Sequence, residues 1–106
     1  MTYIFDIDGT ICNITGGDYE KAEPNEDRIE KINKLHEQGH TIIFHTARGM
    51  GRSENCAVTA HGLFFELTSK QLEEWDVKYH TLILGKPAGD LYVDDKGVND
   101  EHFFSN

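Results

Sequence analysis

Proline and cysteine are scarce: the 106-residue sequence has two of each. Cys12 and Cys56 are too few for a disulfide framework and lack the spacing of a zinc site, so we expect free thiols. The six histidines include no HExxH pair, which removes the commonest helical zinc motif. These absences exclude a disulfide-rich domain and a zinc-based fold.

Long hydrophobic runs are also missing. No apolar stretch is long enough to span a bilayer, and Asp6 and Asp8 interrupt the first apolar segment where a signal peptide would need continuity. We therefore expect a cytoplasmic protein without a membrane partner.

Positively charged residues are also few: the sequence has 10 Lys and Arg against 19 Asp and Glu, which gives a formal net charge of −9. Such a balance disfavours nucleic acid as a partner. Four basic residues nevertheless stand near segments that we expect to share one pocket: Arg48, Arg52, Lys86 and Lys96. A local basic cluster in an acidic protein indicates an anionic ligand, whereas the alternative is ordinary solvated surface charge.

The apolar pattern predicts one α/β domain over residues 1–106. Continuous apolar runs predict strands at 2–7, 41–44, 81–84 and 91–93. A helix is expected after Asn25 as N-cap, with Ile29, Ile32 and Leu35 on one face and a stop at Gly39. The region 54–67 is ambiguous, and T-x-x-Q at Thr68 and Gln71 predicts a capping box for a helix through Trp75. Phe103 and Phe104 in the tail 99–106 are expected to pack back or to meet a partner.

Apolar strands between helices indicate a parallel sheet covered on both faces. We predict a single Rossmann-like three-layer domain with strand order 4-1-2-3. In such sheets ligands bind beyond the carboxyl ends of the strands. That edge would collect Asp6 and Asp8, Thr46, Lys86, and Asp94 with Asp95.

Four converging carboxylates cannot all stay ionised without a cation, and oxygen ligands of this kind select Mg²⁺. Lys86 and the Thr46 hydroxyl suit a phosphoryl group, with Ala47 next to Thr46 in the same phosphate site. Gly9 allows backbone N–H groups to approach the anion. The predicted ligand is therefore a small phosphorylated molecule.

A carboxylate beside a phosphoryl group is a candidate nucleophile, and a second one two positions later is a candidate general acid and base. We assign the first role to Asp6 and the second to Asp8. Arg48 is the candidate substrate-binding residue: it could hold the leaving group or pair with an acid, and the sequence leaves both open. His45 should point to the opposite side of its strand and serve in packing.

The sequence resembles the haloacid dehalogenase superfamily of phosphatases. Its D-x-D-G-T motif stands at Asp6–Thr10, its Thr at Thr46 in IIFHT, its Lys at Lys86, and its acidic pair at Asp94–Asp95 in LYVDD. The resemblance implies that Asp6 is nucleophile and metal ligand, that Asp8 adds a backbone carbonyl to Mg²⁺, and that Asp94 and Asp95 complete the metal site. It leaves open which of these last two binds directly.

No segment has room for the cap domain that many members carry, so the chain looks like a capless member. HTARG, LGKP and VDDK are also similar to small phosphatases of capsule and surface-polysaccharide gene sets, which implies sugar phosphates or related metabolites as substrates. The sequence does not identify the substrate, the oligomeric state or the part that covers the open site. The Phe103–Phe104 tail is compatible with a homo-oligomer.

Two other classes compete with a phosphatase. A phospho-receiver domain also uses a small parallel sheet, a phosphorylated Asp, Mg²⁺, Thr and Lys, but needs its acceptor Asp after a middle strand. A catalytically inactive relative acting as a binding module is the second alternative.

Overall fold

The computed structural model describes residues 1–105. Its elements follow the order β1 (Thr2–Phe5), the 3₁₀ turn η1 (Tyr19–Lys21), α1 (Glu26–Glu37), β2 (Thr41–Thr46), α2 (Ala57–Glu74), β3 (Thr81–Leu84) and α3 (Asp100–Phe103). Asn106, the last residue of the predicted tail, lies outside the described part.

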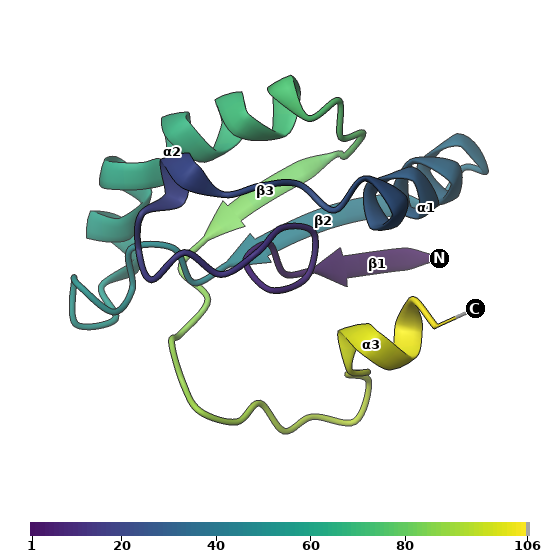
Figure 1. Ribbon diagram of the computed structural model, residues 1–106. Helices are drawn as coiled ribbons and strands as arrows, with labels where there is room; N and C mark the ends of the chain where they lie inside the picture. The colour runs from purple at the N-terminus through teal and green to yellow at the C-terminus, as the bar shows by residue number, and fades with distance from the viewer. Residues whose placement is uncertain (106) are drawn as a thin grey trace.

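Three parallel strands form the sheet, in the order β1-β2-β3 (Figure 1). Phe5 lies beside Phe44 and Phe44 beside Leu82, so these three apolar side chains share one level of the sheet. The predicted parallel sheet and its order 1-2-3 are confirmed. The first strand ends earlier than expected, at Phe5, and the second continues to Thr46.

The predicted fourth strand is wrong for this structure. Residues 91–93 carry no strand assignment and no pairing with β1, and they lie in an exposed segment between β3 and α3. The order 4-1-2-3 is therefore reduced to 1-2-3, and β1 is an edge strand.

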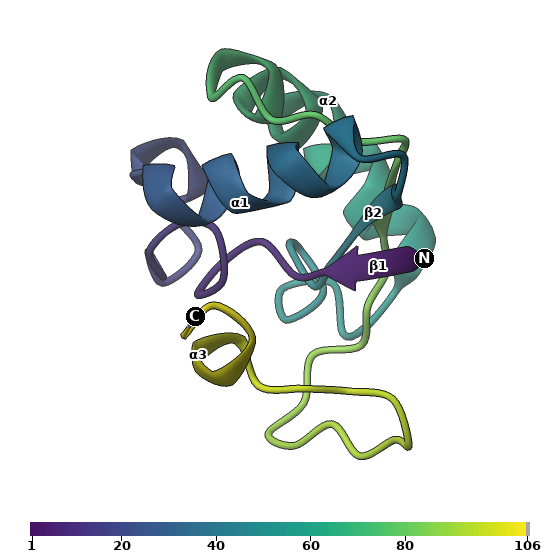
Figure 2. The same cartoon turned by 90° about the vertical axis from the view of Figure 1, so that its right-hand side faces the viewer.

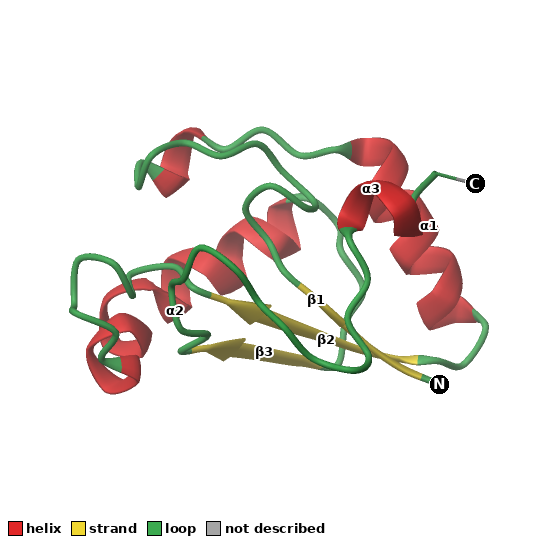
Figure 3. Ribbon diagram, turned by 90° about the horizontal axis from the view of Figure 1, so that it is seen from below, coloured by secondary structure: helices red, strands yellow, loops and turns green. Residues whose placement is uncertain are grey.

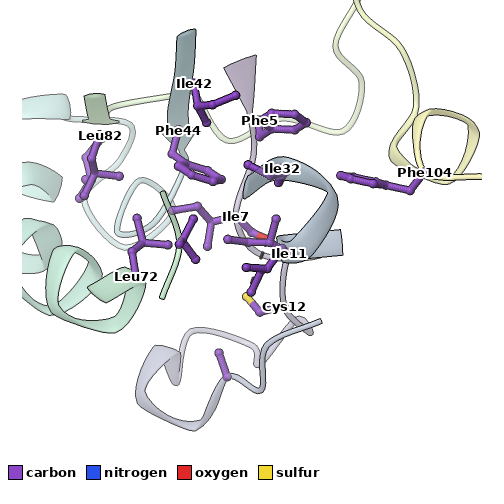
Figure 4. Packing of buried hydrophobic residues seen from close by; sticks show 14 residues of the cluster. Phe5, Ile7, Ile11, Cys12, Ile32, Ile42, Phe44, Leu72, Leu82 and Phe104 are labelled. Carbon is purple, nitrogen blue, oxygen red and sulfur yellow. Dashed lines mark hydrogen bonds between the residues drawn. The ribbon is translucent and has the colours of Figure 1, made fainter. Parts of the chain in front are cut away.

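Both long helices pack on the same face of the sheet. Alternate residues of the strands are buried and point to this face: Ile42 and Phe44 in β2, and Leu82 and Leu84 in β3. Ile29 and Ile32 from α1 and Leu72 from α2 complete this core (Figure 4). The view from below shows α2 behind the strands (Figure 3).

The opposite face of the sheet has no helix over it in the described residues, so the expected three-layer cover is wrong. Ile4 and Ile83 point to this side and are 64% and 43% exposed. Apolar strands would normally be buried on both faces of a parallel sheet. Here the second face presents apolar side chains to solvent.

Helix α1 begins as predicted. The Asn25 side chain accepts a hydrogen bond from the Arg28 backbone N–H at 3.1 Å, and Glu26 and Asp27 occupy the first turn. Gly39 follows the helix with a φ of +93°, a conformation that favours glycine.

Helix α2 corrects the second helical prediction. It runs unbroken through Gly62 and the 54–67 region that the sequence left ambiguous. Thr68 and Gln71 therefore stand inside the helix, buried, rather than forming a capping box. Leu72 faces the core as expected.

The tail packs back. Phe104 is buried, with its ring 6.0 Å from that of Phe5, and Phe103 lies 5.5 Å from Phe5 between ring centroids. Arg28 holds Asp100 at 2.6 Å between Nη1 and Oδ2. Short α3 therefore sits against α1 and β1 (Figure 2).

Candidate active site

The carboxyl ends of the three strands bring together the predicted site residues that follow β1, β2 and β3. Asp6 follows β1, Thr46 ends β2, and Lys86 stands two residues after β3. The backbone N–H groups of Gly85 and Lys86 donate to the Thr46 carbonyl at 3.2 and 3.1 Å. These bonds fix the Lys86 backbone beside β2, although the side chain starts beyond its strand.

Asp6 and Lys86 form the centre of the site. Lys86 Nζ lies 3.5 Å from Asp6 Oδ2, and Asp6 Oδ1 accepts a hydrogen bond from the Ile7 N–H at 2.8 Å. Burial raises the pKa of Asp6, with the Ile7 N–H and Lys86 acting in the opposite direction and nearby Asp8 adding to the increase. The carboxylate is thus partly desolvated, and a single lysine faces it.

Asp8 is held by Arg48 in a two-point fork. Arg48 Nε donates to Asp8 Oδ2 at 2.9 Å, and Nη2 donates to Oδ1 at 3.0 Å. Paired parallel hydrogen bonds of this type fix both the position and the plane of a carboxylate. Asp8 is therefore presented in one orientation, two residues after Asp6.

Arg48 itself is buried, with 1% of its surface exposed. Its Nη1 donates to Gln71 Oε1 at 2.6 Å and to Thr68 Oγ1 at 3.3 Å, and its guanidinium lies 4.8 Å from the centre of the Tyr19 ring. Pairing with an acid was one of the two roles that the sequence left open, and this geometry supplies it. A contact between Arg48 and substrate stays a prediction.

Thr46 and Ala47 line a pocket at the strand ends. Gly9, which was also predicted to bind phosphate, forms a turn directly after Asp8. The Thr46 hydroxyl accepts a hydrogen bond from the Arg48 N–H at 3.1 Å and keeps its own proton for another acceptor. Gly9 has a φ of +83°, but its N–H donates to the Cys12 carbonyl at 2.9 Å. The Gly9 amide is therefore engaged within the turn.

His45 lies on the other face of β2 from Thr46, as its place in the strand predicted. Burial lowers its pKa, and Lys86 lowers it further, while Asp6 acts in the opposite direction. Buried Cys12 lies 3.5 Å from Asp8 Oδ1, and burial raises its pKa to about 12. Its thiol is thus kept protonated and unreactive.

A pocket of about 210 Å³ opens over these residues, lined by Asp6, Asp8, Ile14, Thr15, Gly16, Gly17, Tyr19, Thr46, Ala47 and Arg48. Its size is below the range of pockets that enclose a whole metabolite. The predicted phosphoryl group is small enough to enter it, and its binding there stays a prediction. A larger hollow of about 710 Å³ is lined by Glu23, Glu26, Asp27, Asp100 and Glu101 among others, and that acidity opposes an anionic ligand.

Sequence reasoning missed four contributors: Thr15, Tyr19, Thr68 and Gln71. Among the described residues, the buried Thr15 hydroxyl has no hydrogen-bond partner, although it lines the pocket. The Tyr19 hydroxyl accepts from the Gly49 N–H at 2.9 Å, and Gln71 Nε2 donates to the Tyr19 carbonyl at 2.8 Å. Of the four, only Thr68 and Gln71 had a sequence signal, the T-x-x-Q pattern that we interpreted as a capping box. The four residues were missed because they come from a loop and a helix interior rather than from strand ends.

Asp94 and Asp95 do not join the site. Both are exposed in the segment after β3, where Asp94 Oδ1 accepts from the Lys96 N–H at 2.8 Å. Across residues 1–105, no three His, Cys, Asp or Glu side chains lie close enough together to hold a metal ion. The expected gathering of four carboxylates is thus absent, and the donor set of this single chain does not fit Mg²⁺.

A profile of the haloacid dehalogenase-like hydrolases matches residues 3–61, more than half of the chain. The chain belongs to the haloacid dehalogenase-like hydrolase family. Members of this family are typically phosphatases that depend on magnesium. The match covers the segments that carry Asp6, Asp8, Thr46 and Arg48.

A crystal structure of a target protein from Vibrio cholerae has the same fold, with a TM-score of 0.90 and 29% sequence identity. The similarity covers 99% of this chain and 88% of that chain. No curated protein matches the sequence significantly. Among the described helices, none is both long and apolar enough to cross a membrane.

Proposed function

We propose that the protein hydrolyses phosphomonoesters through an aspartyl phosphate on Asp6. The observation that carries the proposal is the convergence of Asp6, Asp8 and Thr46 on one small pocket at the sheet edge, with Lys86 Nζ 3.5 Å from Asp6 beside it. Membership of a hydrolase family supports the same chemistry.

In the first step, an Asp6 oxygen attacks phosphorus while the bond from phosphorus to the leaving oxygen breaks. Lys86, 3.5 Å from Asp6, offsets the charge of the phosphoryl oxygens. The Thr46 hydroxyl donates to one of those oxygens. The leaving alkoxide takes the proton that Asp8 carries at the start of the cycle, which gives the free alcohol and the Asp8 carboxylate.

In the second step, water attacks phosphorus and gives its proton to Asp8, and the bond between phosphorus and Asp6 breaks. Phosphate leaves and Asp6 is regenerated. Arg48 acts here as a positioning residue, because its fork sets the direction of the Asp8 carboxylate.

A phosphate-release assay with a panel of sugar phosphates and nucleotides, followed by acid quenching on labelled substrate, tests the proposal. We expect label on the wild-type protein that hydroxylamine removes, as for an acyl phosphate, and no label on Asp6→Asn. Turnover by pure Asp6→Asn protein at more than about a thousandth of the wild-type rate would contradict the assignment.

The substrate class is a further part of the proposal. HTARG, LGKP and VDDK support a sugar phosphate or related metabolite of surface-polysaccharide synthesis. The small pocket and the lack of a cap domain in the described chain support a substrate whose larger part stays outside.

The receiver alternative is weakened by topology. Its acceptor Asp would follow a middle strand, whereas Asp6 follows the edge strand β1 and middle strand β2 ends in His45 and Thr46. An inactive binding module is favoured by one observation, the missing metal site of the single chain. Absence of phosphate release from every compound of the panel, with retained phosphate binding, would select that alternative.

A further inference from the structure

The segment between β3 and α3 leaves apolar groups unburied. Leu91 and Val93 are 79% and 85% exposed, and the segment curves away from β1 in two perpendicular views (Figures 1 and 2). It nevertheless carries the apolar LYV run followed by an acidic pair. Such a run is typical of a buried strand.

A matching surface is also unpaired. Within the described residues β1 pairs only with β2, so its other edge presents free backbone groups. Ile4, at the middle of this strand, is 64% exposed. Exposed edges of this kind are templates for pairing with another strand.

Pairing of Leu91–Val93 with β1 would place the acidic pair beside Asp6 only in the parallel direction. With Val93 beside Phe5, Asp94 would stand beside Asp6 at the catalytic edge. An antiparallel arrangement would instead carry Asp94 and Asp95 towards the other end of β1.

The chain's own connection is too short for the parallel arrangement. Six residues separate Leu84, the end of β3, from Leu91, whereas a parallel crossover needs about a dozen or more. The path must cross about 14 Å of sheet and return about 13 Å along the strands. Lys86 is also fixed to Thr46 and Asp6, which leaves only 87–90 to move.

We propose that two copies of this chain exchange residues 91–105, so that the LYV run of one copy extends the sheet of the other at β1. The exchange would bring Asp94 and Asp95 to the partner's Asp6 and Asp8, and so complete a site for a divalent cation. This last consequence rests on the proposed function; the exchange itself does not.

The position of α3 agrees with this arrangement. Arg28 Nη1 binds both the Thr10 carbonyl, at 3.0 Å, and Asp100. The start of α3 therefore lies near the D-x-D-G-T turn. Residues 96–99 would form a short link between α3 and an acidic pair placed at that edge of the sheet. In the exchanged pair the same α3 contacts form between copies, as in domain swapping generally.

A double cysteine variant distinguishes the copies. In a Cys56→Ser background, Ile4→Cys is combined with Tyr92→Cys, and in a second protein with Val93→Cys to cover the neighbouring register. Exchange predicts a disulfide-linked dimer from at least one of them after mild oxidation. A disulfide within one chain, or no disulfide in either protein, overturns the proposal. Glu74→Cys, at the C-terminal end of α2, combined with Tyr92→Cys is the control that should stay unlinked.

Complementation tests the site. Asp6→Asn chains and Asp94→Asn/Asp95→Asn chains, each inactive alone, are unfolded and refolded together. Exchange predicts about one quarter of wild-type activity, because half of the pairs are mixed and each mixed pair has one intact site of two.

The two proposals fail separately. A disulfide-linked dimer with an inactive mixture would refute the placement of the acidic pair and leave the hydrolase chemistry to the Asp6 test. Absence of turnover in the wild type would refute the proposed function, while the disulfide pattern still decides the exchange.

Discussion

At the scale of single residues, the site combines a desolvated carboxylate with a lysine and a fixed second carboxylate. In the proposed mechanism Asp6 attacks phosphorus only when ionised, and burial raises its pKa. Lys86 limits that increase. The chemistry therefore depends on a balance between burial and one nearby positive charge.

This balance predicts a pH profile. Activity should fall as the pH decreases through the raised pKa of Asp6, so the acidic limb of kcat/KM should lie above the ordinary carboxyl value of 3.8. Lys86→Met should lower the rate and also move this limb to higher pH, because the lysine lowers the Asp6 pKa. A limb that stays in place in Lys86→Met would argue against the Asp6–Lys86 contact, and Lys70→Met, at an exposed position of α2, serves as a surface control.

Arg48 should be essential for stability. Arg48→Met leaves Asp8, Thr68 and Gln71 without their partner in a buried setting, and removal of one member of a buried ion pair costs about 3–5 kcal/mol. Urea unfolding monitored by circular dichroism measures the loss. The exposed Arg52→Met, as the matched control, should change the free energy of unfolding by less than about 1 kcal/mol.

Thr15 offers a test of substrate contact. Its unpaired hydroxyl contributes nothing to folding, so Thr15→Val should leave the free energy of unfolding unchanged or raised. If the hydroxyl binds substrate, KM should rise by roughly three- to tenfold, and Thr15→Ser should restore it. An unchanged KM in Thr15→Val would remove Thr15 from the binding site.

At the scale of elements, strand ends and helix α2 build the site together. Helix propensity alone would divide α2, because Gly62 interrupts its sequence pattern. Thr68 and Gln71, further along the same helix, contact Arg48. Hydrogen bonds from Arg48 to Thr68 and Gln71 thus tie this helix to the site, which the local sequence did not indicate.

Gly62 should be replaceable within α2. It is exposed, and a Cβ placed there meets no atom within 4 Å. Gly62→Ala should therefore stabilise the protein by about 0.5–1 kcal/mol, because alanine loses less backbone entropy in a helix. Thermal and urea unfolding check this, with Gly39→Ala as a control of opposite sign, since Gly39 has a φ of +93°.

At the scale of the whole molecule, two surfaces are incomplete: one face of the sheet and the free edge of β1. Association of two copies that exchange residues 91–105 would cover the edge and bury the LYV run. Stability should then depend on concentration, because a dimeric native state is favoured by mass action.

We therefore expect the midpoint of thermal unfolding to rise with protein concentration. Ile4→Lys, which places a charge at the edge strand, should reduce this dependence and yield single chains in size-exclusion chromatography with light scattering. Glu30→Gln at an exposed position of α1 changes the net charge by the same single unit and should have no such effect. A midpoint independent of concentration in the wild type would contradict the exchange.

The sequence by itself determined the parallel strands β1 to β3 and the Asn25 cap, and it predicted that Asp6, Asp8, Thr46 and Lys86 gather at the ends of these strands. It could do so because apolar runs, caps and strand ends are local patterns, and parallel strands gather their carboxyl ends at one edge. Only the tertiary structure decided that Arg48 pairs with Asp8, that Thr68 and Gln71 serve it, and that both helices lie on one face. It also separated Asp94 and Asp95 from Asp6, because six residues after β3 cannot carry the chain back across its own sheet.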